Sequence, residues 1–339
     1  MIKNVLVTGG LGFIGSETVV ELIEKGYSPI IVDNLSNSKL AVLDRIQKIA
    51  CVSPLFYKVD CTDLDSMRKI FAENKIDAVI HFAGFKSVAE SVEKPDEYER
   101  NNVGSLKVVL GLMVEYHVDN LIFSSSATVY GNPERLPVTE EDPIGKPASP
   151  YGRTKIECEL VCKEFCEQYK QLNIALLRYF NPIGAHPSGL LGEDPNGIPN
   201  NLMPYITKVA IGKLPFLHVY GSDYETEDGT AIRDYIHVVD LAKGHIAALN
   251  KLDQKSGLVI YNLGTGKGTS VLEIVNAFKN ATGANLPYQI EGRRPGDVPV
   301  SYANCDKAWK ELNWKTELSI QDACRDAYNF QIKNPNGID

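Results

Sequence analysis

Short apolar runs alternate with amphipathic stretches through the first half of the chain. Runs such as Val5-Leu6-Val7 lack the alternation of a half-exposed strand, so they predict strands that are buried on both faces. The predicted strands are Val5–Thr8, Ile30–Asp33, Leu55–Val59, Ala78–Phe82, Asn120–Ser124 and Ile174–Tyr179. The predicted helices are Ile14–Lys25, Lys39–Ile49, Leu64–Glu73, Tyr98–Tyr116 and Pro150–Tyr169. Strands and helices that alternate in this way are typical of βαβ units, so we expect an α/β fold with a doubly wound parallel sheet.

The composition of the sequence changes after Tyr179. Residues 181–204 hold five prolines with several glycines and asparagines, which predicts a long irregular connection. The elements predicted beyond it are strands at Leu217–Tyr220 and Val259–Leu263 and helices after Asp240, after Ser270, near Asp306 and near Ser319. We therefore predict a first domain over residues 1–180, with segments near 235–265 returning to it. A smaller mixed α/β domain is expected over residues 181–339.

Composition narrows the class of protein. The formal net charge is −8 and no run of Lys and Arg occurs, which argues against a nucleic-acid partner. No apolar run reaches about 18 residues, so no membrane span is expected, and the first residues lack the layout of a signal peptide. Seven cysteines without paired spacing favour a reducing, cytoplasmic compartment. Cys158, Cys162 and Cys166 share a helical face, but packing explains them better than a metal, and no metal is expected.

A glycine-rich turn follows the first predicted strand. Gly10, Gly12 and Gly15 fit the Gly-x-Gly-x-x-Gly spacing, which allows a tight turn and close approach to a pyrophosphate at a helix N-terminus. Asp33 ends the next strand about 20 residues later, where a ribose-binding acid is expected. The pattern predicts a Rossmann-type domain, and an acid without a nearby arginine favours NAD over NADP. Asp60, which ends the third strand, either holds the adenine end or is a solvated strand end.

A second glycine-rich run covers residues 264–269. It resembles a phosphate-binding loop only superficially, because Gly268 follows Lys267 where a P-loop requires Ser or Thr. We therefore interpret it as a loop before a helix that Ser270 caps.

A tyrosine and a lysine lie one turn apart at the start of a predicted helix. Ser149 is a suitable cap and Pro150 suits the first position, so Tyr151 and Lys155 share one helical face. Tyrosine and lysine are common, so the spacing alone is weak evidence, but the pair follows a strand that ends in Ser124-Ser125-Ser126. Ionising an ordinary tyrosine near pH 7 costs about 4 kcal/mol. A lysine charge about 6 Å away supplies roughly 2.8 kcal/mol of this, and an oxidised nicotinamide and the helix N-terminus can supply the rest.

At this point the chain resembles the extended short-chain dehydrogenase/reductase superfamily and, within it, the UDP-glucose/UDP-galactose 4-epimerase family. The stretches that carry the resemblance are residues 33–38, 81–86, 124–131, 177–182, 199–205 and 233–238, which span most of the chain.

The resemblance implies an NAD-dependent isomerase that keeps its NAD bound and unconsumed. Tyr151 would remove the proton of the sugar 4-hydroxyl, Lys155 would support Tyr151, and Ser126 would bond near the reacting oxygen. A 4-keto sugar would form, turn over, and take the hydride back on its other face. The implied cofactor-binding residues are Gly10, Gly12, Phe13, Ile14, Gly15, Asp33, Asn34, Asn37, Asp60, Cys61, Phe82, Ala83, Lys86, Asn101, Ser124, Tyr151, Lys155 and Tyr179.

A UDP-hexose is the implied substrate, and paired arginines suit its diphosphate. The implied substrate-binding residues are Lys86, Ser126, Thr128, Tyr151, Phe180, Asn181, Asn201, Leu202, Leu217, Tyr220, Arg233, Tyr235, Arg294, Asp297 and Ser301. Without the resemblance, a loop cap, surface charges and strand-end packing would explain several of these residues equally well. Relatives of this kind are often dimers, here through Tyr98–Tyr116 and Pro150–Tyr169, so a homodimer is expected.

Three alternatives remain at this point. The nearest is a sugar-nucleotide dehydratase or decarboxylase on the same fold, but a dehydratase needs an acid just after the serine cluster, where this chain has Ala127 and Thr128. A simple alcohol dehydrogenase would need cofactor exchange and leaves the second half unexplained. A regulator without catalysis is compatible with the fold alone, although the complete Tyr, Lys and Ser set argues against it.

Ser301 bears on the choice of sugar. Members of the family restricted to plain hexoses tend to carry tyrosine at the position that Ser301 resembles, and members that accept N-acetylated sugars carry a small residue. We therefore expect activity on UDP-N-acetylglucosamine and UDP-N-acetylgalactosamine as well. Tyr302 is adjacent, however, and a slip of one residue would return an aromatic ring to the pocket.

Overall fold

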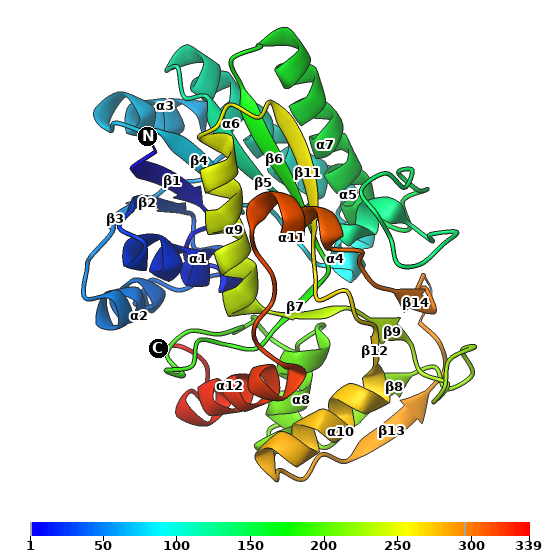
Figure 1. Ribbon diagram of the computed structural model, residues 1–339. Helices are drawn as coiled ribbons and strands as arrows, with labels where there is room; N and C mark the ends of the chain where they lie inside the picture. The colour runs from blue at the N-terminus through cyan, green and yellow to red at the C-terminus, as the bar shows by residue number, and fades with distance from the viewer. Residues whose placement is uncertain (1, 295) are drawn as a thin grey trace.

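The computed structural model describes residues 2–294 and 296–339. Its centre is a sheet of seven parallel strands in the order β11-β6-β5-β4-β1-β2-β3 (Figure 1). The strands are β1 (Asn4–Thr8), β2 (Ser28–Asp33), β3 (Leu55–Lys58), β4 (Ala78–His81), β5 (Asn120–Ser126), β6 (Asn173–Tyr179) and β11 (Leu258–Leu263). The predicted α/β class with a doubly wound parallel sheet is confirmed.

Helices cover both faces of this sheet, as its apolar strands require. Neighbouring residues of β1 belong to different cores: Val5 and Val7 pack with α1, α2 and α9, whereas Leu6 packs with α3, α6 and α7. The helices around the sheet are α1 (Phe13–Glu24), α2 (Ala41–Ala50), α3 (Leu64–Glu73), α4 (Val88–Glu93), α5 (Pro95–Tyr98), α6 (Ser105–Glu115), α7 (Pro150–Gln168), α9 (Val238–Leu252) and α11 (Asp306–Leu312). Within the described residues, no helix is both long and apolar enough to cross a membrane.

The second half adds small sheets and three helices below the carboxyl edge of the main sheet (Figure 1). These helices, α8 (Leu202–Ala210), α10 (Val271–Thr282) and α12 (Ile320–Lys333), enclose a core of their own. The small sheets pair β7 (Asn181–Ile183) with β10 (Tyr235–His237), β8 (Leu217–Tyr220) with β13 (Tyr288–Glu291), and β9 (Ile232–Arg233) with both β12 (Thr269–Ser270) and β14 (Val300–Ser301).

Two predicted elements differ from the structure. The single helix expected at Tyr98–Tyr116 is interrupted by a π-helix, η1 (Glu99–Gly104), in which Asn102 turns toward the chain after β4 and accepts a hydrogen bond from the N–H of Phe85 at 2.7 Å. The connection at residues 181–204 is not wholly irregular, because it begins with β7 and ends in the first three residues of α8.

The topology determines where a ligand can bind. Strand β1 pairs with β2 on one side and β4 on the other, so the chain direction across the sheet reverses beside it. In such sheets ligands bind outside the carboxyl ends of the strands at this reversal. The glycine turn, Asp33, the chain after β4 and the serine cluster all lie at these carboxyl ends or directly after them.

Candidate active site

The glycine turn after β1 forms a cradle that leaves no room for side chains. Gly9 adopts a φ of +70°, and a Cβ on Gly15 would overlap the carbonyl oxygen of Gly9. Because Gly12 precedes α1, no side chain caps the first N–H groups of that helix. These groups and the helix dipole suit a pyrophosphate, so the residues fit a dinucleotide.

The acid at the end of β2 lies against this cradle. Asp33 accepts hydrogen bonds from the N–H of Leu11 at 3.1 Å and of Leu35 at 2.9 Å. The amide of Asn34 donates to Asp60 at 2.9 Å, next to the buried Cys61. The structure thus brings the predicted adenosine-side residues together at one edge of the sheet, with Asn37 in the turn that follows.

Lys155 is buried and faces the end of β5. Ser149 caps α7 by accepting from the N–H of Gly152 at 3.1 Å, and Pro150 occupies the first turn, as predicted. The ammonium Nζ of Lys155 donates to the carbonyl oxygen of Ser124 at 2.7 Å and lies 5.8 Å from the centroid of the Tyr151 ring. Only 7% of Lys155 is exposed, so its charge acts in a poorly hydrated place.

Two hydroxyl groups follow the same strand. Ser126 ends β5 and accepts a hydrogen bond from the N–H of Thr128 at 3.2 Å, which begins the 3-10 turn η2 (Ala127–Tyr130). The hydroxyl of Thr128 is buried and has no hydrogen-bond partner within the described chain. A buried hydroxyl without a partner is costly, which is consistent with a site that a ligand completes.

Tyr179 ends β6 and lies beside Ser126, its register partner on β5. Its hydroxyl is hydrogen-bonded to Nε2 of His245, whose ring packs at a tilt against Phe82 with 4.8 Å between the ring centroids. Burial raises the pKa of Tyr179 and lowers the pKa of His245 to about 4, so both are neutral near pH 7. Tyr179 therefore supplies shape and a neutral hydroxyl beside Ser126.

Phe180 and Asn181 continue from β6 toward the second half of the chain. Phe180 is buried, and Asn181 lies in register with Tyr235 across the pair β7–β10. Burial raises the pKa of Tyr235 to about 12, which keeps its phenol neutral.

The two predicted diphosphate arginines converge on one carboxylate. Asp297 lies 3.2 Å from Nε of Arg294 and 3.9 Å from Nη2 of Arg233. The Arg294 guanidinium stacks 4.8 Å from the centroid of Tyr220. Leu217, at the other end of β8, is only 2% exposed and packs in the core of the second half, so its side chain does not join this group.

A cavity of about 520 Å³ lies next to these arginines. It is lined by Asn132 and by residues 146–148 on one side and by residues 296–299 on the other. Lys146 was not predicted as a site residue, because no local pattern distinguishes it from other surface lysines.

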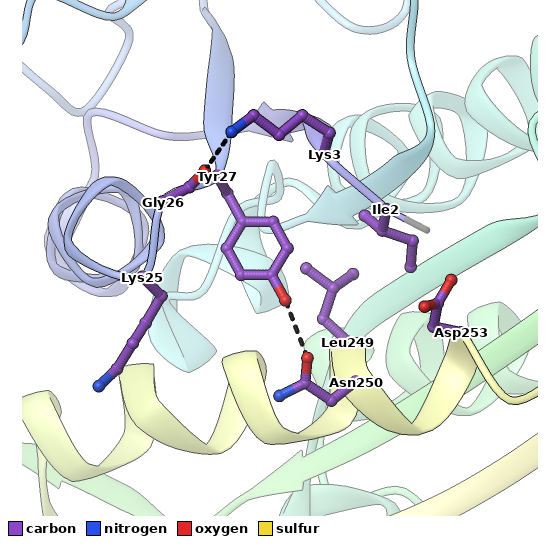
Figure 2. A pocket seen from close by; sticks show the side chains of 8 residues that line it. All are labelled: Ile2, Lys3, Lys25, Gly26, Tyr27, Leu249, Asn250 and Asp253. Atoms are coloured by element: carbon purple, nitrogen blue, oxygen red, sulfur yellow. Dashed lines mark hydrogen bonds between the residues drawn. The ribbon is translucent and has the colours of Figure 1, made fainter.

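Another cavity, of about 360 Å³, lies at the opposite, amino edge of the sheet (Figure 2). Within it the hydroxyl of Tyr27 donates to Asn250 at 2.8 Å and Nζ of Lys3 donates to the carbonyl of Gly26 at 2.8 Å. This cavity is remote from the loops that carry the predicted site.

Ser301 shares a face of its small sheet with Arg233. The two residues are register partners in the parallel pair β14–β9, and register partners point the same way. Tyr302 points to the other face, where a Cβ on Gly268 would lie 3.3 Å from its ring.

A buried carboxylate that the sequence did not reveal fixes this region. Asp234 accepts hydrogen bonds from the N–H groups of Thr265 at 2.8 Å, Gly266 at 3.0 Å and Ala303 at 3.2 Å. The run at residues 264–269 thus binds a protein carboxylate. Ser270 caps α10 with Glu273 in a capping box, which confirms the interpretation of the run as a loop before a capped helix.

Lys86 and Asn201 meet at a single glutamate. Nζ of Lys86 and the amide of Asn201 each donate to Oε1 of Glu193 at 2.7 Å. Leu202 begins α8 directly after Asn201. Asn101 donates to Asn102 at 3.1 Å and so supports the chain before Lys86 indirectly.

A Rossmann-type sheet, a glycine cradle with an acidic neighbour, and a buried lysine one turn from a tyrosine define a nicotinamide enzyme of the short-chain dehydrogenase/reductase type. Residues 5–264 match the NAD dependent epimerase/dehydratase family. UDP-glucose 4-epimerase 2 of Arabidopsis thaliana is 54% identical over 99% of this chain and 97% of its own length. UDP-glucose 4-epimerase of Bacillus subtilis is 50% identical over 98% of each chain.

A crystal structure of UDP-glucose 4-epimerase from Bifidobacterium longum in complex with NAD+ and UDP superposes with a TM-score of 0.96. It is 53% identical and covers 99% of this chain and 100% of that chain. The chain therefore belongs to the NAD dependent epimerase/dehydratase family and, within it, to the UDP-glucose 4-epimerases.

Proposed function

We propose that this chain interconverts UDP-galactose and UDP-glucose by inverting C4 of the hexose on a retained NAD. The observation that carries the proposal is the buried Lys155, which is fixed at the carboxyl end of β5 beside Tyr151. Full-length identity of about half to UDP-glucose 4-epimerases supports it. When bound, NAD would accept a hydride from C4 and return it to the same carbon, so the reaction would pass through a 4-keto sugar without net oxidation.

Tyr151 is the proposed base for the 4-hydroxyl and later the acid that returns the proton. Lys155 stabilises the tyrosine anion, and because an ammonium has three donors and one is bound by Ser124, two remain for Tyr151 and the nicotinamide ribose. Ser126 accepts from a backbone N–H, which leaves its own O–H free to donate to the sugar oxygen. Thr128 offers an unpartnered buried hydroxyl at the same place.

The adenosine side of the dinucleotide would bind at the carboxyl ends of β1 and β2, away from Tyr151 and Lys155. The glycine cradle and the first N–H groups of α1 would hold the pyrophosphate, and Asp33 would hold the adenosine ribose. The other proposed cofactor contacts are Phe13, Ile14, Asn34, Asn37, Asp60, Cys61, Phe82, Ala83, Lys86, Asn101 and Tyr179.

The UDP moiety fits the second half of the chain. Arg233 and Arg294 lie together on Asp297 and can donate paired hydrogen bonds to a diphosphate. Tyr235 keeps a neutral hydroxyl as a donor. The remaining proposed contacts are Phe180, Asn181, Asn201, Leu202, Leu217 and Tyr220.

We also propose that N-acetylated sugars are substrates. Ser301 shares a face with Arg233, and Tyr302 points away, which supports an opening beside the sugar that an acetamido group can fill. Ser301→Tyr should abolish activity on UDP-N-acetylgalactosamine and leave UDP-galactose turnover within about threefold, because a ring fills that space. Equal turnover of the N-acetyl sugar by parent and variant would refute the role of Ser301.

The remaining proposals concern organisation. We propose a dinucleotide-binding domain over residues 1–180, joined by return segments near 235–265, and a UDP-sugar domain over residues 181–339. We propose a homodimer that pairs through η1–α6 and α7, which the exposed Leu160 on α7 supports. We also propose a cytoplasmic location, which is supported by the seven cysteines, all free in the structure. Light scattering of the purified chain and of Leu160→Glu tests the dimer.

The function is tested with purified protein and no added NAD. Incubation with UDP-galactose, and separately with UDP-N-acetylgalactosamine, is followed by chromatography and mass spectrometry. Conversion of each sugar to its C4 epimer without a change of mass is expected. A product lighter by one water would instead identify a dehydratase, and no conversion by protein that contains bound NAD would refute the proposed activity.

A further inference from the structure

Glu193 connects the two halves of the proposed site through one oxygen atom. Lys86, in the chain after β4, and Asn201, which precedes α8, both donate to Oε1 of Glu193 at 2.7 Å. The Glu193 side chain is only 8% exposed, whereas that of Lys86 is 48% exposed. The carboxylate therefore lies beneath its two donors and can fix the direction in which each points.

The main chain that carries this carboxylate is fixed on both sides of Glu193. A Cβ on Gly192 would lie 2.6 Å from the Phe330 ring, so the chain packs tightly against α12 at this point. The next residue, Asp194, binds Nζ of Lys39 at 2.9 Å and accepts from the N–H of Ile338 at 2.8 Å. The main chain on both sides of Glu193 is thus held by contacts that involve neither Lys86 nor Asn201.

We infer that Glu193 is a positioning residue that couples retention of NAD to binding of the UDP-sugar. The inference rests on the proposed function, in which Lys86 contacts the cofactor and Asn201 contacts the substrate. A free lysine side chain loses rotamer freedom when it is ordered, and the ion pair with Glu193 orders it in advance. The same oxygen orients the amide of Asn201, so loss of Glu193 releases both contacts together.

If Glu193 had a purely structural role, its loss would mainly lower the melting temperature. Because ion pairs with one half-exposed partner contribute little to stability, we expect Glu193→Ala to change the melting temperature only slightly. It should instead raise KM for UDP-galactose about fivefold to tenfold with kcat within twofold, because an oriented hydrogen bond to the substrate is lost. It should also lower the fraction of NAD that stays bound after extended dialysis.

The test compares Glu193→Ala and Glu193→Gln of the full chain, measuring KM, kcat, melting temperature and bound NAD per protein. The glutamine keeps an oxygen that accepts from Asn201, so its KM should return to within twofold of the parent. Glu317→Ala is the matched control, because it removes an ion pair of 2.9 Å with Lys243 away from the site. It should leave KM and bound NAD unchanged.

Three further variants separate this inference from the proposed function. Asn201→Ala should raise KM, Lys86→Ala should lower bound NAD, and Glu193→Ala/Asn201→Ala should have the KM of Asn201→Ala alone. Single variants of Lys86 and Asn201 that leave both quantities unchanged would refute the proposed roles of those residues. If these singles act as expected but Glu193→Ala does not, or if the double variant is additive, the positioning role of Glu193 is overturned.

Discussion

Replacing Lys155 with methionine removes a buried positive charge while keeping most of the volume of the side chain. The ammonium lies 5.8 Å from the centroid of the Tyr151 ring. At an effective dielectric constant of about 20, a unit charge about 6 Å from a phenolate oxygen stabilises the anion by about 2.8 kcal/mol. Each 1.36 kcal/mol corresponds to a factor of ten in rate, so kcat at pH 7 should fall about 100-fold.

The pH dependence of this loss identifies its cause. If the charge serves to make proton removal easier, the kcat of Lys155→Met should rise with pH over about two pH units beyond the point where the parent reaches its plateau. The assay measures UDP-glucose formed from saturating UDP-galactose between pH 6 and pH 10, with bound NAD measured in each sample. Tyr151→Phe is the matched control, because it lacks the group that ionises and should be poorly active at every pH.

Two results would refute this reasoning. A kcat of Lys155→Met within threefold of the parent at pH 7 would mean that the charge does not support catalysis. A loss of about 100-fold that is the same at every pH, with bound NAD unchanged, would mean that Lys155 acts by shape or by its bond to Ser124 alone.

Two further predictions concern stability. Glu159→Ala should lower the free energy of unfolding by about 3–5 kcal/mol in a denaturant titration. The ion pair of 2.7 Å between Glu159 and Arg178 is buried, so the variant leaves the charge of Arg178 without its carboxylate. A loss below about 1 kcal/mol would contradict this. Burial, followed by the nearby Glu21 charge, raises the pKa of Glu17 well above 4.5. The stability that protonated Glu17 confers is therefore complete below about pH 4.5 and is lost as pH rises toward the folded-state pKa. Glu17→Gln should thus raise the melting temperature by about 1–3 °C at pH 8, and more at pH 8 than at pH 5; an equal effect at both pH values would rule out this ionisation.

The parts of the site that the sequence predicted depend on local chemistry. Each of these parts depends on only a few neighbouring residues. The glycine cradle needs a positive φ, Asp33 stands at the end of a strand, and the start of α7 has a serine cap. Their three-dimensional proximity follows from the parallel sheet, because the carboxyl ends of its strands share one edge.

The parts that were missed depend on contacts between distant segments. Glu193 lies 107 residues from Lys86, and no spacing rule relates the two. Asp234 looks like an ordinary polar residue between two short strands, although it binds main-chain N–H groups more than 30 residues away. The π-helix around Asn102 depends on a bond to Phe85, which the periodicity of residues 98–116 does not contain.

Isotopic labelling shows whether C4 is inverted on a retained NAD. Purified protein without added NAD is given UDP-glucose that carries deuterium at C4, and the UDP-galactose formed is examined by mass spectrometry and NMR. We expect the deuterium to be retained at C4 of the product, because the hydride leaves and returns to the same carbon without contact with water. Loss of the deuterium to solvent, or a product formed only when NAD is added continuously, would contradict it.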